Sequence, residues 1–196
     1  NFGERGMEGS AFTCSAMLGA CEAGFQWQQA LALLAEARLA LLELDVVAWN
    51  VALSCCEAVG QWEVALELLK DIARAGPGPD VVSYNTATSA CARATQWRCA
   101  LGMLRSLGPA GLTADVVTFG AAISACEGDG QWEQALELLA EMRRAGCEPD
   151  LVALAAVLAA LGAAARRAPL LPLLADTADR CSASVRARRQ LGTPVL

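Results

Sequence analysis

The chain contains no histidine among its 196 residues. Without histidine, neither a mixed Cys/His zinc site nor a Ser-His-Asp or Cys-His catalytic pair can form. The nine cysteines include no Cys-x-x-Cys pair, and the acidic residues are spread along the chain rather than clustered. These absences predict a protein that is not an enzyme, with no catalytic residue, metal, cofactor or small-molecule substrate.

Charged residues are also scarce, at 18% of the chain, and the formal net charge is −6. A negative balance argues against a uniformly basic nucleic-acid-binding protein, although it permits a local basic stripe. The longest uncharged run, residues 151–165, is shorter than the roughly 20 residues that span a bilayer. We therefore expect no membrane partner and interpret this run as an ordinary helix. Because the chain starts with Asn1 rather than methionine, we expect a fragment of a longer protein.

The sequence does contain a short motif that recurs every 35 residues. A Gln-Trp pair, followed shortly by Ala-Leu, recurs at Trp27, Trp62, Trp97 and Trp132. The same step separates Asp45, Asp80, Asp115 and Asp150, and also Cys21, Cys56, Cys91 and Cys126. A period of this length is typical of stacked supersecondary units, none of which can bury its apolar face alone. The composition is 55% hydrophobic and 5% aromatic, with alanine and leucine dominant, which favours helices.

The repeat at 80–114 indicates a helical hairpin. Asp80 suits an N-cap, because its carboxylate can accept hydrogen bonds from the free amides of a first helical turn. Apolar and small residues at helical spacing predict a first helix of about twelve residues, and Gln96-Trp97 opens a second helix. The segment from Gly108 to Gly111 ends it. We interpret the recurring tryptophans and cysteines as core residues, with free thiols in a reducing compartment.

The 35-residue step divides most of the chain into repeats. We predict an N-terminal flank at 1–9, repeats at 10–44, 45–79, 80–114 and 115–149, a degenerate repeat at 150–184, and a basic tail at 185–196. The first repeat lacks glycine and proline between Leu31 and Leu44, so we expect its second helix to run to about Glu43. Pro169 and Pro172 predict that the last second helix is shifted, broken or replaced by an irregular cap.

Three segments carry a resemblance to a known family. The repeat at 115–149 opens with Asp-Val-Val and closes with Met-Arg-Arg-Ala-Gly-Cys-Glu-Pro, while Tyr84-Asn85-Thr86 and Trp49-Asn50-Val51 supply the opening motif of two other repeats. In these motifs the chain resembles the pentatricopeptide repeat (PPR) family. The resemblance implies an all-α fold, a right-handed α-solenoid of stacked helical hairpins with about five repeats of 35 residues. Tetratricopeptide repeats have a different period and carry their tryptophan in the first helix.

The resemblance also implies single-stranded RNA binding at one base per repeat. In the family, a base is read by the fifth residue after the opening Asp, together with the Asp that opens the next repeat. Here these pairs are Ser15 with Asp45, Asn50 with Asp80, Asn85 with Asp115, and Gly120 with Asp150. They imply a G-U-U-N-like target, read 5′ to 3′, because a hydroxyl with Asp resembles the guanine combination and Asn with Asp the uracil combination. Ala155 with Val185 breaks the pattern and is assigned no base.

The residue after each opening Asp is implied to be an aliphatic wedge between successive bases. Val46, Val81 and Val116 fit this role, with Ala11 and Leu151 as weaker versions. An ordinary cap and ordinary packing remain alternatives for the aspartates and valines. Asparagine is a poor helix-interior residue, which favours a base contact for the two asparagines.

Family repeats often carry a lysine near the end of the first helix, where this chain has Ala23, Ala58, Arg93 and Gly128. Because neutralisation of phosphate supplies much of nucleic-acid affinity, we expect weak RNA binding. The resemblance implies organellar RNA processing or expression, in a mitochondrion or chloroplast. The missing lysines and the negative charge favour an alternative, a protein-interaction scaffold that binds a peptide or partner helix in its concave groove.

Overall fold

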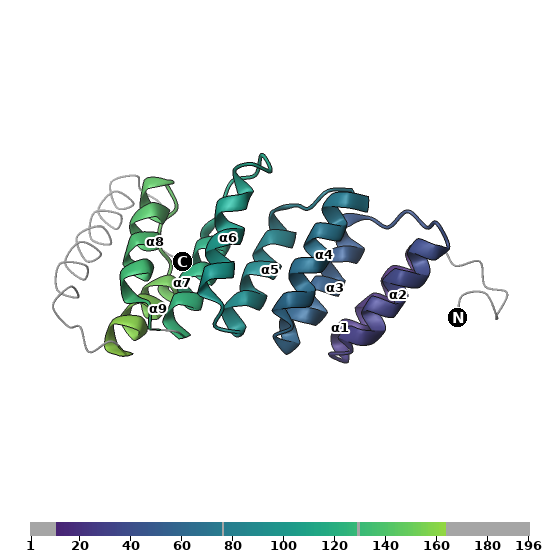
Figure 1. Ribbon diagram of the computed structural model, residues 1–196, viewed down its shortest axis with the longest axis horizontal. Helices are drawn as coiled ribbons and strands as arrows, with labels where there is room; N and C mark the ends of the chain where they lie inside the picture. Colours follow the sequence, from purple (N-terminus) through teal and green to yellow (C-terminus); the bar gives the residue numbers. More distant parts are fainter. Residues whose placement is uncertain (1–10, 76, 129, 164–196) are drawn as a thin grey trace, which may run out of the picture.

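The computed structural model describes residues 11–75, 77–128 and 130–163. Over these residues the secondary structure consists of nine α-helices and no strand. In chain order they are α1 (Ala11–Ala23), α2 (Trp27–Leu39), α3 (Val46–Val59), α4 (Trp62–Ala75), α5 (Val81–Arg93), α6 (Trp97–Leu107), α7 (Val116–Gly128), α8 (Trp132–Arg144) and α9 (Leu151–Ala163). Figure 1 shows them stacked along the long axis of the molecule, from α1 and α2 at one end to α8 and α9 at the other. The predicted all-α solenoid is confirmed.

Each odd-numbered helix from α3 onward begins directly after a capping aspartate. The side chain of Asp45 accepts a hydrogen bond from the Ala48 amide at 2.9 Å, and that of Asp150 accepts one from the Ala153 amide at 2.8 Å. The aspartates before α5 and α7 make the equivalent bond. The even-numbered helices begin at the recurring tryptophans. The carboxylate cap therefore sets where each of these repeats starts.

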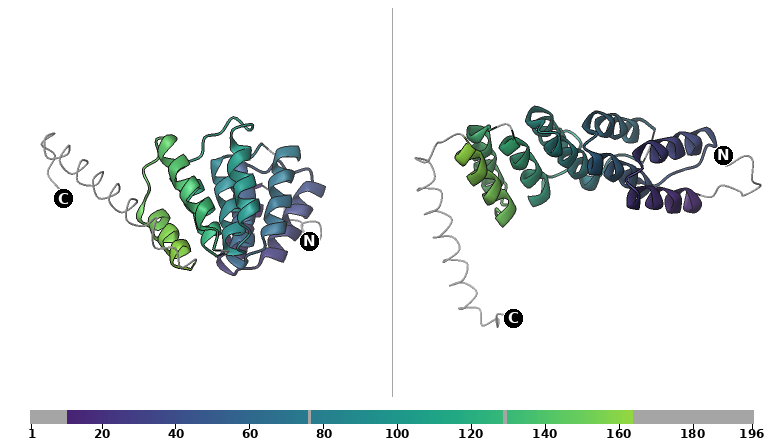
Figure 2. Two further views of the ribbon diagram at one scale, coloured as in Figure 1. Left: turned by 60° about the vertical axis from the view of Figure 1, so that its left-hand side comes forward. Right: turned by 90° about the horizontal axis from the view of Figure 1, so that it is seen from below.

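The helices form two layers, and Figure 2 shows the stack from two further sides. Each odd-numbered helix packs directly on the next odd-numbered helix, whereas the even-numbered helices pack mainly on the odd-numbered ones. A stack with one layer more closely spaced than the other curves towards the closer layer, which is how solenoids form a concave surface. We therefore call the layer of α1, α3, α5, α7 and α9 the inner layer.

Small and aliphatic side chains fill the space between the layers. In α6 the buried residues are Ala100, Leu101, Leu104 and Leu107, as the helical spacing predicts. The tryptophans that begin the even-numbered helices are half-buried and pack against this core. The guanidinium carbon of Arg98 lies 5.1 Å from the centre of the Trp97 ring. These contacts support a packing role for the tryptophans.

The repeat-spaced cysteines also belong to the core. Cys21, Cys56, Cys91 and Cys126 are all buried. Burial raises the pKa of the Cys91 thiol to about 12 and that of Cys126 to about 11. A thiol that stays protonated is a poor nucleophile and a poor metal ligand. In the described part of the chain, no group of three or more His, Cys, Asp or Glu side chains is placed to hold a metal ion.

The second helix of the first hairpin is shorter than expected. α2 ends at Leu39, so the prediction that it runs to about Glu43 is wrong. Leu41 adopts a left-handed conformation with φ of 53°, as Gly111 (74°) and Gly146 (80°) do at the same repeat position. The chain must reverse here to reach the next hairpin, and this closure overrides the helix propensity of the local sequence.

Residues 151–163 of the uncharged run form α9, which packs on α7 and α8. Among the described residues, none of the helices has the length and apolar character needed to cross a membrane. The predictions for Pro169, Pro172, Val185 and the basic tail lie outside the described residues.

Candidate nucleic-acid interface

The two asparagines predicted to read bases each contact the aspartate that opens the next repeat. Asn50 on α3 donates from Nδ2 to Oδ1 of Asp80 at 3.1 Å. Asn85 on α5 donates from Nδ2 to both carboxylate oxygens of Asp115, at 3.1 Å each. Both asparagines are half-buried. The structure thus brings the members of these two predicted pairs together across the boundary between hairpins.

A hydroxyl residue that the sequence analysis missed completes each pair. Ser83 lies three residues after Asp80, and its Oγ donates to Oδ1 of Asn50 at 2.6 Å. Thr118 holds the equivalent position one repeat later, and its Oγ1 donates to Oδ1 of Asn85 at 2.5 Å. Both hydroxyl residues are fully buried. A Ser or Thr at N3 behind a capping Asp is a recognisable signal for the start of a helix, and its separation of 33 residues from an Asn is what could have identified it.

These hydroxyl residues are also fixed to the start of their own helices. The amide of Ser83 donates to Oδ1 of Asp80 at 2.8 Å, and the amide of Asp80 donates to Oγ of Ser83 at 3.2 Å. Thr118 and Asp115 exchange the same two bonds, at 2.8 and 3.2 Å. Such reciprocal bonding satisfies two free amides of the first turn. Each asparagine therefore meets a carboxylate and a hydroxyl whose positions are already set.

Electrostatics decides which way each asparagine amide faces. Partial burial alone would raise the pKa of Asp80, but the hydrogen bonds from Ser83 and Asn50 outweigh it and hold the pKa below the usual 3.8. The same balance lowers the pKa of Asp115. An ionised carboxylate can only accept hydrogen bonds, so the NH₂ group must face the aspartate and the carbonyl oxygen must face the hydroxyl.

The other two predicted pairs have different surroundings. At their junctions the hydroxyl position is alanine, Ala48 after Asp45 and Ala153 after Asp150. Both of these aspartates are exposed, whereas Asp80 and Asp115 are half-buried. Their predicted partners are Ser15 on α1, which is half-buried, and Gly120 on α7, which is buried and has no side chain. The combination of Asn, Asp and hydroxyl therefore occurs at the two central junctions.

Two successive apolar residues follow each capping aspartate, and their environments differ. The first residue, which the family resemblance implies as the wedge, is half-buried at Val46, Val81 and Val116. The second residue is exposed in each of these repeats and in the next, by 61% at Val47, 54% at Val82, 58% at Val117 and 63% at Val152. A side chain must be accessible to contact RNA. The exposure therefore favours the second residue over the first as a wedge.

The one basic residue at the ends of the predicted first helices is paired with an acid. Nε of Arg93 lies 3.7 Å from Oε1 of Glu57 on α3. Burial raises the pKa of Glu57, and Arg93 beside it only partly opposes this effect. Glu22 and Glu127 hold the position of Glu57 in two other repeats. This end of the inner layer is therefore richer in acids than in bases.

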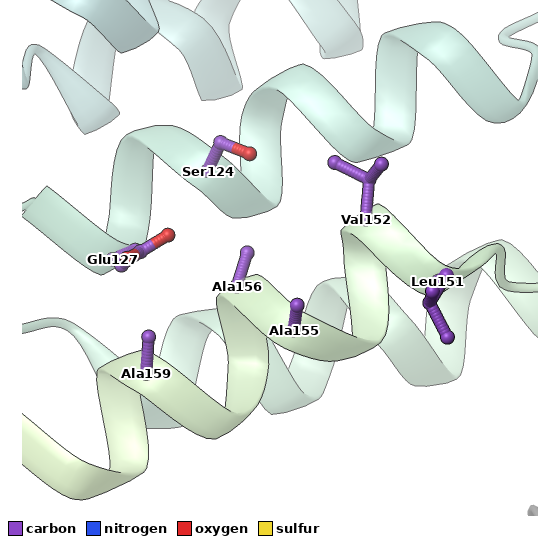
Figure 3. Close-up of a pocket in the computed structure, with 7 residues that line it drawn as sticks. All are labelled: Ser124, Glu127, Leu151, Val152, Ala155, Ala156 and Ala159. Carbon is purple, nitrogen blue, oxygen red and sulfur yellow. The ribbon is translucent and has the colours of Figure 1, made fainter.

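A pocket of about 450 Å³ lies between α7 and α9 (Figure 3). Its lining residues are Ser124 and Glu127 of α7, and Leu151, Val152, Ala155, Ala156 and Ala159 of α9. Figure 3 shows Ala156 and Ala159 pointing towards α7, where their short side chains leave the space open. Ala155 holds the repeat position of Asn85, and Val152 that of Val82. The pocket thus lies in the same row as the two Asn–Asp pairs.

Comparison with known proteins agrees with this geometry. The model of the PPR repeat family matches residues 44–93 and 114–162, which together make up just over half of the chain. Curated protein sequences give no significant match.

Solved structures of PPR proteins share the fold. PPR10 in complex with an 18-nt psaJ RNA element is 28% identical, with a TM-score of 0.71 over 83% of this chain and 24% of that chain. PPR10 from maize is 26% identical, with a TM-score of 0.70 over 89% of this chain and 25% of that chain. The PPR domain of Arabidopsis thaliana protein-only RNase P 1, in complex with tRNA, is 19% identical, with a TM-score of 0.65 over 92% of this chain and 90% of that domain.

The chain therefore spans about a quarter of the length of PPR10. The repeat-spaced motifs, the stacked hairpins and the family match agree, and the chain belongs to the PPR repeat family.

Proposed function

We propose that this chain binds single-stranded RNA along its inner layer, with one base per repeat. The observation that carries the proposal is the pair of Asn–Asp contacts, Asn50 with Asp80 and Asn85 with Asp115, on successive helices of that layer. The RNA complex of PPR10 supports the proposal, because that protein is similar in fold and is 28% identical over the matched part.

Each paired asparagine keeps hydrogen-bonding capacity for a base. Asn50 uses one N–H towards Asp80 and one lone pair of Oδ1 towards Ser83. An amide has two N–H donors and two oxygen lone pairs, so one donor and one acceptor remain. The Watson–Crick edge of uracil presents an N3–H donor between two carbonyl acceptors, which matches this donor and acceptor side by side. We therefore assign uracil to Asn50 and to Asn85.

The neighbouring positions complete the proposed target. Ser15 with Asp45 is assigned guanine, on the family resemblance. Gly120 with Asp150 is assigned no preference, because glycine offers no side chain to meet a base edge. The target is then G-U-U-N, read 5′ to 3′ from the first repeat to the fourth.

The exposed valines supply apolar surface between successive bases. Val47, Val82 and Val117 lie three residues before the base-reading position of their own helix, which places both on one helix face. Aliphatic contact with base faces does not depend on sequence, so these side chains add affinity rather than specificity. We assign the wedge to this row rather than to Val46, Val81 and Val116.

The paired acids and the scarcity of cations set the expected strength of binding. Phosphate contacts supply much of nucleic-acid affinity, and Arg93 is already engaged by Glu57. We expect weak binding with a shallow dependence on salt, because few phosphates are neutralised. The cellular setting in this proposal, organellar RNA processing or expression, follows from the family resemblance.

Fluorescence anisotropy with short labelled RNAs tests the proposal. We expect an oligonucleotide containing G-U-U-N to bind more tightly than one in which both uracils are replaced by cytosine. Asn50→Ala and Asn85→Ala should each reduce this preference. Gln134→Ala is the matched control, because it removes an amide side chain from α8, in the other layer.

The same titration separates the alternatives. Equal and salt-dependent binding of both oligonucleotides would refute the base assignments while leaving general RNA binding. No binding at low salt would refute RNA binding by this chain. That result would favour a protein-interaction scaffold, which the acidic ends of the inner helices also suit.

A further inference from the structure

We infer that the hydroxyls of Ser83 and Thr118 are positioning groups for base reading: each holds the side-chain carbonyl oxygen of an asparagine and, together with the aspartate that binds the NH₂ group, keeps the amide in one orientation towards the RNA. This inference rests on the proposed function. Its starting observation is the short contact from Ser83 to Asn50 at 2.6 Å and from Thr118 to Asn85 at 2.5 Å.

Each hydroxyl has one proton, and the distances indicate where it goes. Oγ of Ser83 lies 2.6 Å from Oδ1 of Asn50 and 2.8 Å from Oδ1 of Asp80. Oγ1 of Thr118 lies 2.5 Å from Oδ1 of Asn85 and 2.9 Å from Oδ1 of its own capping aspartate. The carboxylate oxygen already accepts a backbone amide, at 2.8 Å in both repeats. The same oxygen also accepts the asparagine N–H, so both of its lone pairs are engaged, and we assign the hydroxyl proton to the shorter contact, with the asparagine as acceptor.

The two hydroxyls act through the asparagines rather than on RNA. Ser83 and Thr118 are 0% exposed, whereas both asparagines are half-buried and reach the surface. A base on the inner layer can therefore touch the amide but not the hydroxyl beneath it. Ser83 and Thr118 are positioning residues in this sense.

Across the four repeat junctions, a Ser or Thr at the hydroxyl position accompanies an asparagine at the base-reading position. Where the base-reading residue is Asn50 or Asn85, the residue 33 positions later is Ser or Thr. Where the base-reading residue is Ser15 or Gly120, the residue at the same separation is alanine. Capping alone does not explain this difference, because the aspartates before Ala48 and Ala153 cap their helices without a hydroxyl.

The orientation of the amide distinguishes uracil from cytosine. Uracil carries a donor at N3, whereas cytosine carries an acceptor at N3 beside an amino donor. An amide free to turn by half a rotation can offer either its oxygen or its NH₂ group to the N3 position, and so can accept both bases. An amide held by a carboxylate on one side and a hydroxyl on the other keeps one orientation. The hydroxyl should therefore contribute to uracil preference more than to total affinity.

Thr118→Val tests the inference, because valine keeps the shape of threonine and removes the hydroxyl. We expect the preference for uracil over cytosine at the third base of G-U-U-N to fall by about threefold to tenfold, the usual effect of one net hydrogen bond. Thr118→Ser should retain the preference. Thr88→Val is the matched control: it also removes a buried hydroxyl, which donates to the carbonyl of Tyr84 at 2.7 Å, but it leaves Asn85 untouched.

A readout without RNA separates this inference from the proposed function. The chain has only three asparagines, Asn1, Asn50 and Asn85, so the side-chain amide signals in an ¹⁵N NMR spectrum are readily assigned by substitution. Thr118→Val should shift the Asn85 amide signals, and Thr88→Val should not. Unchanged signals in Thr118→Val would overturn the inference even if RNA binding holds. Shifted signals with no uracil preference in the wild type would overturn the proposed base reading, and with it the role of the hydroxyl in that reading.

The fourth repeat offers the converse test. A Cβ atom placed on Gly120 would meet no side chain or neighbouring helix within 4 Å, so a side chain can start there without a clash at Cβ. Gly120→Asn combined with Ala153→Ser should create a preference for uracil at the fourth base, larger than that of Gly120→Asn alone. An equal preference in the single and double variants would show that the hydroxyl contributes nothing to reading, and would overturn the inference.

Discussion

Asn85 donates its side-chain amide to both carboxylate oxygens of Asp115, at 3.1 Å each, although the two residues belong to different hairpins. Asp115 also caps α7 through the amide of Thr118. One carboxylate therefore defines where a repeat begins and orients the residue that we propose reads the base of the preceding repeat. In the proposed function, stability and recognition are therefore coupled at this residue.

This coupling predicts how the stability of the chain depends on pH. Asp115→Ala should lower the free energy of unfolding by about 1–2 kcal/mol at neutral pH, the usual cost of losing a carboxylate cap. Because hydrogen bonds lower the folded-state pKa of Asp115 below its usual 3.8, its stabilisation is complete above that value. It is lost as the pH falls through the lower folded-state pKa. Denaturant unfolding of both proteins between neutral and acidic pH should show the difference shrinking with acid.

Asp150→Ala provides the comparison for this prediction. It removes the cap of α9 in a repeat where the paired position is Gly120, so no asparagine contact is lost. We expect a smaller loss of stability than for Asp115→Ala. Equal losses would mean that the asparagine contact adds nothing to the cap.

A second prediction concerns the strained turn after α2. Leu41 has a φ of 53° and is 90% exposed, so its side chain gains little from packing. A left-handed conformation costs a non-glycine residue about 1–2 kcal/mol, while glycine loses about 0.5–1 kcal/mol more backbone entropy on folding. Leu41→Gly should therefore stabilise the chain by about 0.5–1 kcal/mol, measured by thermal unfolding. Ala35→Gly, at an exposed position inside α2, should instead destabilise it by about 1 kcal/mol.

The repeat period was sufficient to predict the architecture, because it depends on features that every unit must share. Trp97 begins a helix and Asp80 caps one, and residues one repeat away do the same for the same reason. The residue at which α2 ends could not be predicted from the repeat period in this way. Leu41 looks like a helix former, and only its alignment with Gly111 and Gly146 reveals the left-handed turn.

The contacts between hairpins were harder to predict than the hairpins themselves. Asn50 and Asp80 could be paired only through the family resemblance, and Ser83 resembled an ordinary capping residue. Its hydroxyl contacts Asn50 because the first helices of neighbouring hairpins pack side by side. A local sequence pattern does not reveal this packing. The two adjacent valines after each cap pose a similar difficulty: successive helix positions point about 100° apart, and the sequence does not say which of the two is more exposed.

The two valines after each cap give a third prediction, which distinguishes the two wedge assignments. Val82→Ala should weaken RNA binding by about threefold, since it removes two methyl groups from an exposed apolar contact, and should leave the melting temperature nearly unchanged. Val81→Ala should do the reverse: it shortens a half-buried side chain, and should cost about 1 kcal/mol of stability with little effect on RNA affinity. Loss of RNA binding in Val81→Ala but not in Val82→Ala would restore the first valine as the wedge.

A fourth prediction concerns the acid that engages Arg93. Glu57→Gln removes the charge that lies 3.7 Å from Nε of Arg93 and leaves this exposed guanidinium available to phosphate. We expect RNA affinity to rise by about twofold to fivefold at low salt, and the gain to shrink as salt is added, because exposed charges are screened. Glu63→Gln, on the even-numbered helix α4, changes the net charge equally and should have a smaller effect. An equal gain in both variants would assign it to overall charge.

Glu57→Gln should also change the free energy of unfolding, in a direction that the pKa of Glu57 predicts. Burial raises the pKa of Glu57 in the folded chain, so ionisation of this carboxyl opposes folding. The wild type therefore gains stability relative to Glu57→Gln as the pH falls through the raised pKa, and loses it above. We expect the glutamine variant to be at least as stable at neutral pH, with the difference shrinking in acid. A large loss of stability at neutral pH would instead show that the ion pair with Arg93 outweighs the cost of burying the carboxylate, and that the acid is retained for the fold.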